Sequence, residues 1–235
     1  DQNWVSQDLG AHGRVLLYYG TMLAFIVGIG AKLITALLGW TALPTHQIGS
    51  FQVKKETFNW KVYGPPIFQA FLFTLSFVIE IYRYPVAGRT LRALVVSLIA
   101  FKYWRIQRMP KEAGKLPVWI WIAAWLLLVG LWFHALLPQY GVHAAHIFFV
   151  GGYGLMILMI SSRVTLAHGG FDLEIEKKSP VFMIIGLLTI AAMLTRVTAI
   201  VTTNYFNHLA YAGAVWVAAL LVWSVFFLPK IFFRS

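Results

Sequence analysis

Histidine is the residue type in this chain that is best suited to hold a redox-active metal. The sequence has seven histidines and no cysteine, which excludes Fe–S clusters, thiolate zinc sites and covalent C-x-x-C-H haem attachment. A neutral imidazole is the commonest protein ligand for haem iron and copper. His143 and His146 are three residues apart, so on a helix they share one face. We therefore expect any cofactor to be bound mainly by histidine.

Four charged residues lie inside strongly apolar stretches, namely Lys32, Glu80, Arg163 and Arg196. Ionisable groups within a membrane are costly and usually face the protein interior or a cavity. Arg163 is either an interfacial cation that extends toward the lipid headgroups or a cation that holds an anion such as a haem propionate. Glu80 and Arg196 are expected at similar depths, where they could form a structural ion pair.

The amino-acid composition indicates whether this chain lies in water or in a lipid bilayer. Apolar residues make up 60% of the 235 residues, charged residues only 11%, and the mean hydropathy is +0.73. This excludes a soluble domain and a disordered chain. The net charge of +11 is typical of basic residues beside apolar spans rather than of nucleic-acid binding. We expect an integral membrane protein whose partner is the lipid bilayer.

The apolar stretches predict an all-α, polytopic helical membrane protein with about seven transmembrane helices in a single bundle over residues 1–235. Gly169-Gly170 is expected to end one helix, and Pro180 to lie in the first turn of the next. The expected spans are residues 15–40, 66–84, 91–104, 117–137, 142–166, 180–203 and 208–229.

The distribution of cations predicts the topology. With seven spans, most lysines and arginines fall on the side that holds residues 102–115, 177–178 and the C-terminus, which places the C-terminus in the cytoplasm. His168 follows His146 by 22 residues, or roughly 33 Å of helix, so the two cannot share a metal. Five histidines are expected at the non-cytoplasmic end, where each could also simply cap a helix or contact water: His12, His134, His143, His146 and His208.

Two motifs resemble the signature of the NnrS family. The first has His146 followed by glycines five and eight residues later, Gly151 and Gly154. The second is the run from Arg163 to His168, whose arginine stands seventeen residues after the first histidine. The resemblance covers residues 102–234 well, which would be the family's C-terminal half. Family members have about twelve spans, and a His-x-His-Glu-Met-type motif of their first half is missing here. Because the chain begins with Asp1, we expect it to be part of a longer protein.

The resemblance implies a bacterial inner-membrane protein with non-covalent b-type haem and copper, linked to nitric oxide or nitrosative stress. It implies His146, Arg163 and His168 as cofactor-binding residues by motif. The topology adds His134 and His143 to the cofactor-binding set and gives His143, His146 and His208 as candidate metal ligands. A protein of this kind would bind a diatomic ligand or a redox partner. No residue is assigned a catalytic role.

Two other functions are compatible with the same residues. A cofactor-free transporter or sensor would use the charged residues inside the spans as a path for anions or protons. Alternatively, the basic segment 102–115 could dock a soluble partner, although positive-inside anchoring explains those cations equally well.

Overall fold

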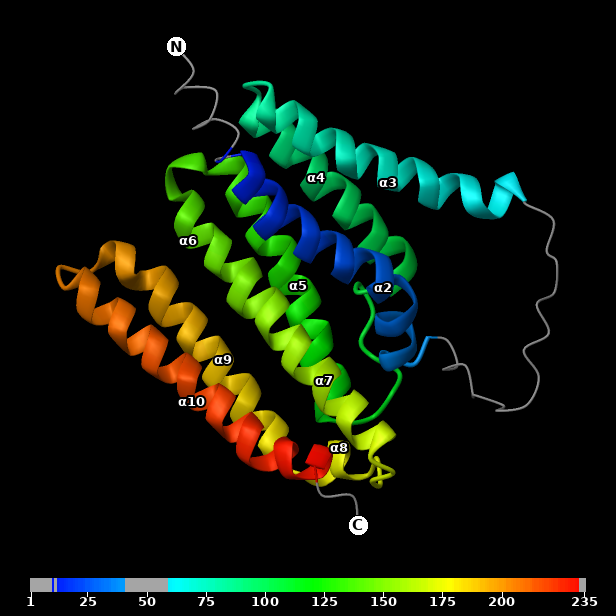
Figure 1. Ribbon diagram of the computed structural model, residues 1–235, viewed down its shortest axis with the longest axis vertical. Coiled ribbons are helices and arrows are strands. Elements are labelled where there is room, and N and C mark those ends of the chain that lie inside the picture. Colours follow the sequence, from blue (N-terminus) through cyan, green and yellow to red (C-terminus); the bar gives the residue numbers. More distant parts are fainter. Residues whose placement is uncertain (1–9, 11, 41–58, 233–235) are drawn as a thin grey trace.

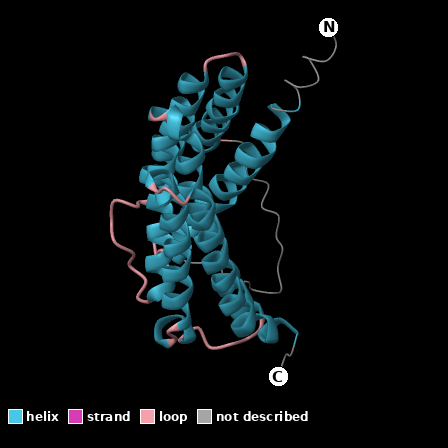
Figure 2. Cartoon of the chain, turned by 90° about the vertical axis from the view of Figure 1, so that its left-hand side faces the viewer, coloured by secondary structure: helices cyan, strands magenta, loops and turns pink. Residues whose placement is uncertain are grey.

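The computed structural model describes residues 10, 12–40 and 59–232, and in this part of the chain every regular element is helical. Most of the long helices run side by side and α3 crosses them at an angle, and the start of α2 and the end of α10 lie at opposite ends of the molecule (Figures 1 and 2). The predicted all-α architecture is therefore confirmed.

The helices form three groups (Figure 1). On one side lie α2, α3 and α4, in the centre lie α5 and the α6–α7 rod, and on the other side lie α9 and α10. The first group contains η1 (Leu16–Thr21), α2 (Met22–Leu37), α3 (Trp60–Ile81), α4 (Pro85–Ile99) and η2 (Ala100–Trp104). The others contain α5 (Lys115–Leu136), η3 (Pro138–Tyr140), α6 (Gly141–His146), η4 (Ile147–Gly154), α7 (Leu155–His168), α8 (Ile175–Lys178), α9 (Val181–Thr198), η5 (Ala199–Val201) and α10 (Tyr205–Phe232).

Five helical segments of the described chain are long and apolar enough to cross a membrane: Tyr63–Ile81, Lys115–Leu136, Pro138–His168, Val181–Val201 and Tyr205–Phe232. These correspond to five of the seven expected spans. The other two, residues 15–40 and 91–104, are helical through η1–α2 and α4–η2. The chain is therefore a multi-pass helical protein suited to a lipid bilayer.

Helix ends follow local chemistry that the apolar pattern shows only in part. Helix α3 begins earlier than expected, at Trp60, because the Asn59 side chain caps it by accepting a hydrogen bond from the Lys61 amide at 3.0 Å. The predicted helix exit is confirmed, because Gly170 adopts a left-handed conformation with φ of 73°. Pro180 caps α9 rather than lying in its first turn.

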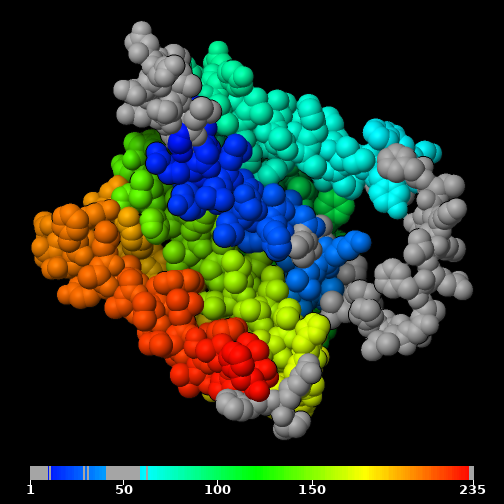
Figure 3. All heavy atoms as spheres, viewed as in Figure 1, coloured from blue at the N-terminus to red at the C-terminus, as the bar shows by residue number. Residues whose placement is uncertain are grey.

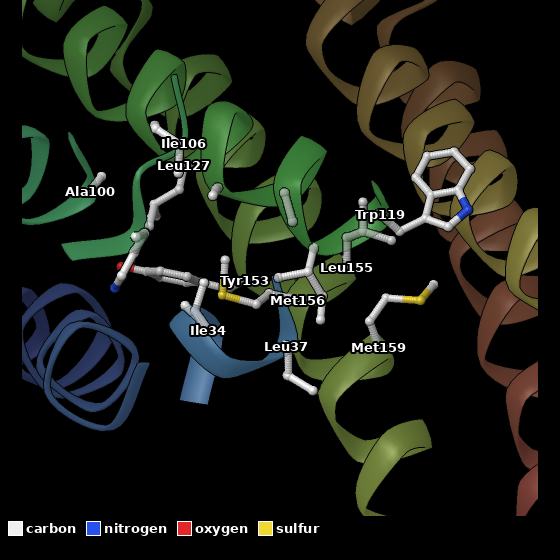
Figure 4. Close-up of a cluster of buried hydrophobic side chains, with 14 of the residues drawn as sticks. Ile34, Leu37, Ala100, Ile106, Trp119, Leu127, Tyr153, Leu155, Met156 and Met159 are labelled. Carbon is white, nitrogen blue, oxygen red and sulfur yellow. The ribbon is translucent and has the colours of Figure 1, made fainter. Parts of the chain in front are cut away.

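Helix α5 lies at the centre of the core because glycines let its neighbour approach closely. A Cβ atom on Gly130 of α5 would lie 2.6 Å from the backbone nitrogen of Phe148 in η4, and one on Gly152 would lie 3.0 Å from the Cα atom of Leu127. The close-up in Figure 4 shows Met156 among Ile34, Leu37 and Tyr153, where side chains of α2, η4 and α7 meet.

One end of the bundle, which we call the cation-rich end, is where α2 and α7 end and α5 and α9 begin. Here the Lys115 ammonium donates to the backbone oxygens of Lys178 and Ser179, at 3.0 and 2.9 Å. The Lys111 amide donates to the Leu38 carbonyl at 2.9 Å. These contacts hold the α8 segment and the α2 terminus against the start of α5. We call the other end, where α9 passes into α10, the opposite end.

Candidate functional site

A cavity of about 290 Å³ lies between the central rod and the α9–α10 pair, toward the opposite end of the bundle. Its walls are mostly apolar, and two side chains in it have strong polar chemistry, His146 and Arg196. Figure 3 shows that α10 forms the outer edge of the molecule on this side. The lining residues are His146, Val150, Ala192, Arg196, Leu209, Ala212, Gly213 and Trp216.

The His146 side chain is oriented by the backbone of its own helix. Its Nδ1 lies 2.6 Å from the carbonyl oxygen of Val142, which is a hydrogen bond with Nδ1 as donor. This contact fixes the tautomer in which Nε2 keeps its lone pair, the usual arrangement of a metal-binding histidine. His146 also immediately precedes η4, an eight-residue π-helical segment. Such segments are rare and frequently occur at functional sites.

Arg196 brings a guanidinium group into the same cavity. Its Nη2 donates to the Tyr205 hydroxyl at 3.3 Å, and the guanidinium carbon lies 5.6 Å from the centre of the Tyr205 ring. Its Nη1 is buried and has no hydrogen-bond partner among the described residues. A buried donor without a partner is costly, so an acceptor that enters the cavity would be bound favourably.

His143 and His208 lie near the cavity, but neither lines it. His143 is on α6, one turn before His146, and the two rings interact electrostatically. His208 precedes the lining residue Leu209 on α10. The Nδ1 atoms of both rings are buried without a hydrogen-bond partner in the described structure. Over the described ranges, no three His, Asp or Glu side chains come close enough together to hold a metal ion.

His134 lies in a different environment from His146. Its ring stacks on Tyr19 with the centroids 5.3 Å apart and packs edge-on against Phe148 at 5.8 Å. The side chain is 6% exposed and belongs to the core around α5. The structure therefore does not bring His134 and the cavity together.

Arg163 and His168 lie at the cation-rich end, well separated from His146 as the helical spacing predicts. Arg163 donates a hydrogen bond to the carboxylate of Glu176 on α8, so this guanidinium already has an anionic partner. Burial raises the pKa of Glu176, and Arg163 opposes that shift. His168 is exposed at the end of α7. The partner of Arg163 could not be identified from the sequence, because Glu176 lies in a polar connection whose path was unknown.

The expected ion pair between Glu80 and Arg196 is wrong. Glu80 binds Arg89 and Arg92 of α4 instead, because the short turn after α3 brings these arginines alongside it. Lys32 is exposed on α2, far in sequence from these groups. The charged residues within the spans therefore lie in separate contacts and do not line one path.

The glycines and methionines near His146 serve helix packing. A Cβ atom on Gly154 would lie 2.7 Å from the Trp216 ring, and Gly151 is covered by Met193. Met156 and Met159 are fully buried in the hydrophobic core (Figure 4). These two methionines are thus packing residues of the core, which is the usual role of methionine in an apolar helix.

A comparison with protein-family models identifies the relatives of this chain. The model of the NnrS protein family matches residues 2–234. The chain belongs to the NnrS family. The match extends over essentially the whole chain and thus well beyond the C-terminal half that the motifs suggested. No curated protein and no solved structure matches it. For this NnrS family member, the cavity with His146 is the described site that best combines a free ligand atom with space beside it.

Proposed function

We propose that this NnrS family member is a haem-binding membrane protein that takes part in nitric oxide or nitrosative-stress chemistry. The observation that carries the proposal is a pair of polar atoms in one apolar cavity that have no hydrogen-bond partner among the described residues, the Nε2 of His146 and the Nη1 of Arg196. The first suits iron, and the second suits a carboxylate such as a haem propionate.

The cavity suits such a ligand in the chemistry of its walls. Its volume of about 290 Å³ is close to the lower limit of small-molecule sites. Its outer wall is α10, which also packs along α9 and whose Trp223 indole nitrogen donates to the Ser162 hydroxyl of α7 at 2.9 Å. Trp216 offers an aromatic surface against which a flat ligand could pack.

The residues of this chain have distinct roles in the proposed site. The Val142 carbonyl holds the His146 ring so that Nε2 stays unprotonated and available. Arg196, itself positioned by Tyr205, orients the acidic edge of the ligand. The apolar walls exclude water. When bound, haem would supply a redox-active iron that can bind a diatomic molecule or transfer electrons.

Copper fits the described residues less completely. A copper site usually needs three or more side-chain ligands, and only pairs such as His143 and His146 lie close together in the described structure. We propose that any copper is held by His143 and His146.

The proposed setting is the bacterial inner membrane with the C-terminus in the cytoplasm. Lysines and arginines gather at the cation-rich end, which includes Lys111, Lys115 and Lys178, and the positive-inside rule puts that end in the cytoplasm. The His146 cavity would then face the non-cytoplasmic side.

Visible absorption spectra test the proposal. The chain is expressed with sufficient haem and purified, and spectra are taken before and after reduction with dithionite, with iron and copper analysis of the same sample. We expect a b-type haem spectrum and iron bound in proportion to protein. A colourless preparation without iron would contradict the proposal.

A matched pair of variants assigns the ligand. His146→Ala removes the proposed ligand, whereas His12→Ala removes a histidine that is expected at the same end and does not line the cavity. We expect the first to lose most of the haem and the second to retain it. Equal spectra for both would exclude His146 as the ligand.

A further inference from the structure

A second polar centre lies on the other side of the central helices, away from the cavity. Glu80 of α3 accepts a hydrogen bond from the Nε of Arg89 at 2.9 Å and another from Arg92. The guanidinium of Arg92 also packs over the Phe77 ring, with its carbon 3.6 Å from the ring centroid. Gly88 lets α4 approach α3 closely at this point, because a Cβ atom on Gly88 would lie only 2.6 Å from the Glu80 amide nitrogen.

This centre carries more positive than negative charge. Two arginines share one carboxylate, so one positive charge remains even if every neighbouring tyrosine and histidine is neutral. The site is well removed from water, because the side chains of Arg92 and Glu80 are 2% and 9% exposed. An uncompensated charge is costly to bury, and the cost is greater within a bilayer. The excess charge therefore calls for an anion.

The groups around the arginines can donate hydrogen bonds. Tyr153 of η4 is 3% exposed, and its hydroxyl has no hydrogen-bond partner among the described residues. That hydroxyl interacts electrostatically with Arg92 and with Tyr19. Tyr19 and His134 in turn both interact with Arg89, Arg92 and Glu80. The centre is thus rich in donors, and Glu80 is the one carboxylate that these interactions include.

Arg89 is the charged group of this centre that is most open to its surroundings. Its side chain is 22% exposed, and its Nε donates to Glu80 at 2.9 Å. Arg89 follows the short turn at residues 82–84, which lies at the end of α3 and therefore near the membrane surface. An anion could approach Arg89 from that surface.

We propose that the centre formed by Glu80, Arg89, Arg92 and Tyr153 binds one small monovalent anion. The two guanidiniums supply the attraction, the Tyr153 hydroxyl supplies a directed hydrogen bond, and Glu80 limits the affinity by offsetting one charge. Two sources supply this chemistry, a free ion such as chloride and the phosphodiester of an anionic lipid headgroup. The proposal does not depend on haem binding at His146.

Chloride binding to the purified protein tests the proposal. The protein is exchanged into non-ionic detergent with gluconate as the only other anion, and bound radiolabelled chloride is measured by equilibrium dialysis. We expect saturable binding of one chloride per chain. In a parallel arm, the protein in zwitterionic vesicles is titrated with phosphatidylglycerol. Uptake of this lipid in place of chloride would also support the proposal and identify the headgroup as the source.

Variants of opposite sign distinguish an anion site from a structural ion cluster. Arg89→Gln should weaken binding about tenfold or more, whereas Glu80→Gln should tighten it by a similar factor. Tyr153→Phe removes only one hydroxyl, is expected to fold normally, and should weaken binding several-fold. Arg83→Gln changes an exposed arginine in the same turn and should leave binding unchanged.

Three results would overturn the proposal. The first is that neither chloride nor phosphatidylglycerol binds saturably. The second is that Glu80→Gln and Tyr153→Phe leave the affinity of the bound anion unchanged. The third is that the wild type shows the ultraviolet absorption of a tyrosinate and the Tyr153→Phe variant does not. Tyr153 would then itself be the anion that balances the charge of the arginines.

Discussion

The two polar regions of this bundle differ in how their charged groups are satisfied. At the His146 cavity, few polar atoms lie among apolar walls, and the Nη1 of Arg196 has no hydrogen-bond partner among the described residues. At the Glu80 centre, two arginines of α4 both contact one carboxylate of α3. The first region offers polar atoms to a ligand, whereas the contacts of the second also hold α3 and α4 together. The difference indicates that the role of an ionisable residue inside a span depends on the residues that it contacts.

The largest expected effect separates the two regions by stability. Glu80→Leu leaves the buried Arg92 and the half-buried Arg89 without a carboxylate and should lower the free energy of unfolding by about 3–5 kcal/mol. Arg196→Leu removes a guanidinium that has no acidic partner among the described residues and should change that free energy by less than about 1 kcal/mol. Denaturant titration in detergent micelles measures both. Equal losses would remove the distinction between the regions.

Glycine substitutions should show the same contrast in packing. Gly130→Ala places a methyl group against the Phe148 backbone and should cost about 1–3 kcal/mol of unfolding free energy. Gly213→Ala faces open space in the cavity wall, so it should be neutral or stabilise α10 by up to about 1 kcal/mol. Thermal unfolding of both variants tests this. A destabilised Gly213→Ala would show that the cavity wall is tightly packed.

Arg196 is predicted to act on the ligand rather than on the fold. Arg196→Gln should weaken haem binding about tenfold, because a hydrogen bond to a charged group is lost. Arg14→Gln alters an exposed arginine expected at the same end and serves as the control. Titration of haem-depleted protein with haem, followed by absorbance, measures both affinities. An unchanged affinity in Arg196→Gln would remove this residue from the site.

The smallest effect is a pH dependence at the cation-rich end. Because burial raises the pKa of Glu176 above its ordinary value of 4.5, the native state holds this proton more tightly than the unfolded state. The contribution of Glu176 to stability is therefore fully present below pH 4.5 and is lost as the pH rises through the pKa of the native state. The unfolding temperature of the wild type, compared with Glu176→Gln, should therefore fall as the pH rises from 4.5 toward neutrality.

Glu174 provides a control of opposite sign for this pH dependence. A hydrogen bond from Lys177 lowers the pKa of this exposed carboxyl, so its contribution is lost as the pH falls. The contribution of Glu174 to the unfolding temperature should therefore rise with pH, whereas that of Glu176 should fall. Comparison of Glu174→Gln with the wild type measures the first contribution. Slopes of the same sign in the two comparisons would contradict the assignment.

The sequence was sufficient to predict the helices, because apolar runs of membrane length have few alternatives in lipid. It also predicted that His146 and His168 lie far apart, since both are on one continuous helical rod. It could not predict which charges pair, because pairing depends on the turns. The α3–α4 turn brings Arg89 and Arg92 to Glu80, and α8 folds back to bring Glu176 to Arg163.

The position of Arg196 in the cavity wall is the clearest part of the candidate site that sequence reasoning missed. Its orientation depends on Tyr205, which lies beyond the turn between α9 and α10. The π-helical segment η4 was equally unpredictable, because its residues are ordinary apolar and glycine residues.

Chemical rescue tests the central claim, that His146 is the haem ligand, most directly. His146→Gly removes the imidazole and leaves space for a free one beside the cavity. The variant is purified with and without imidazole, and its haem content and visible spectrum are measured. We predict that haem is lost without imidazole and that imidazole restores both the content and the wild-type spectrum. A His146→Gly protein that keeps a wild-type haem spectrum without imidazole would contradict the account.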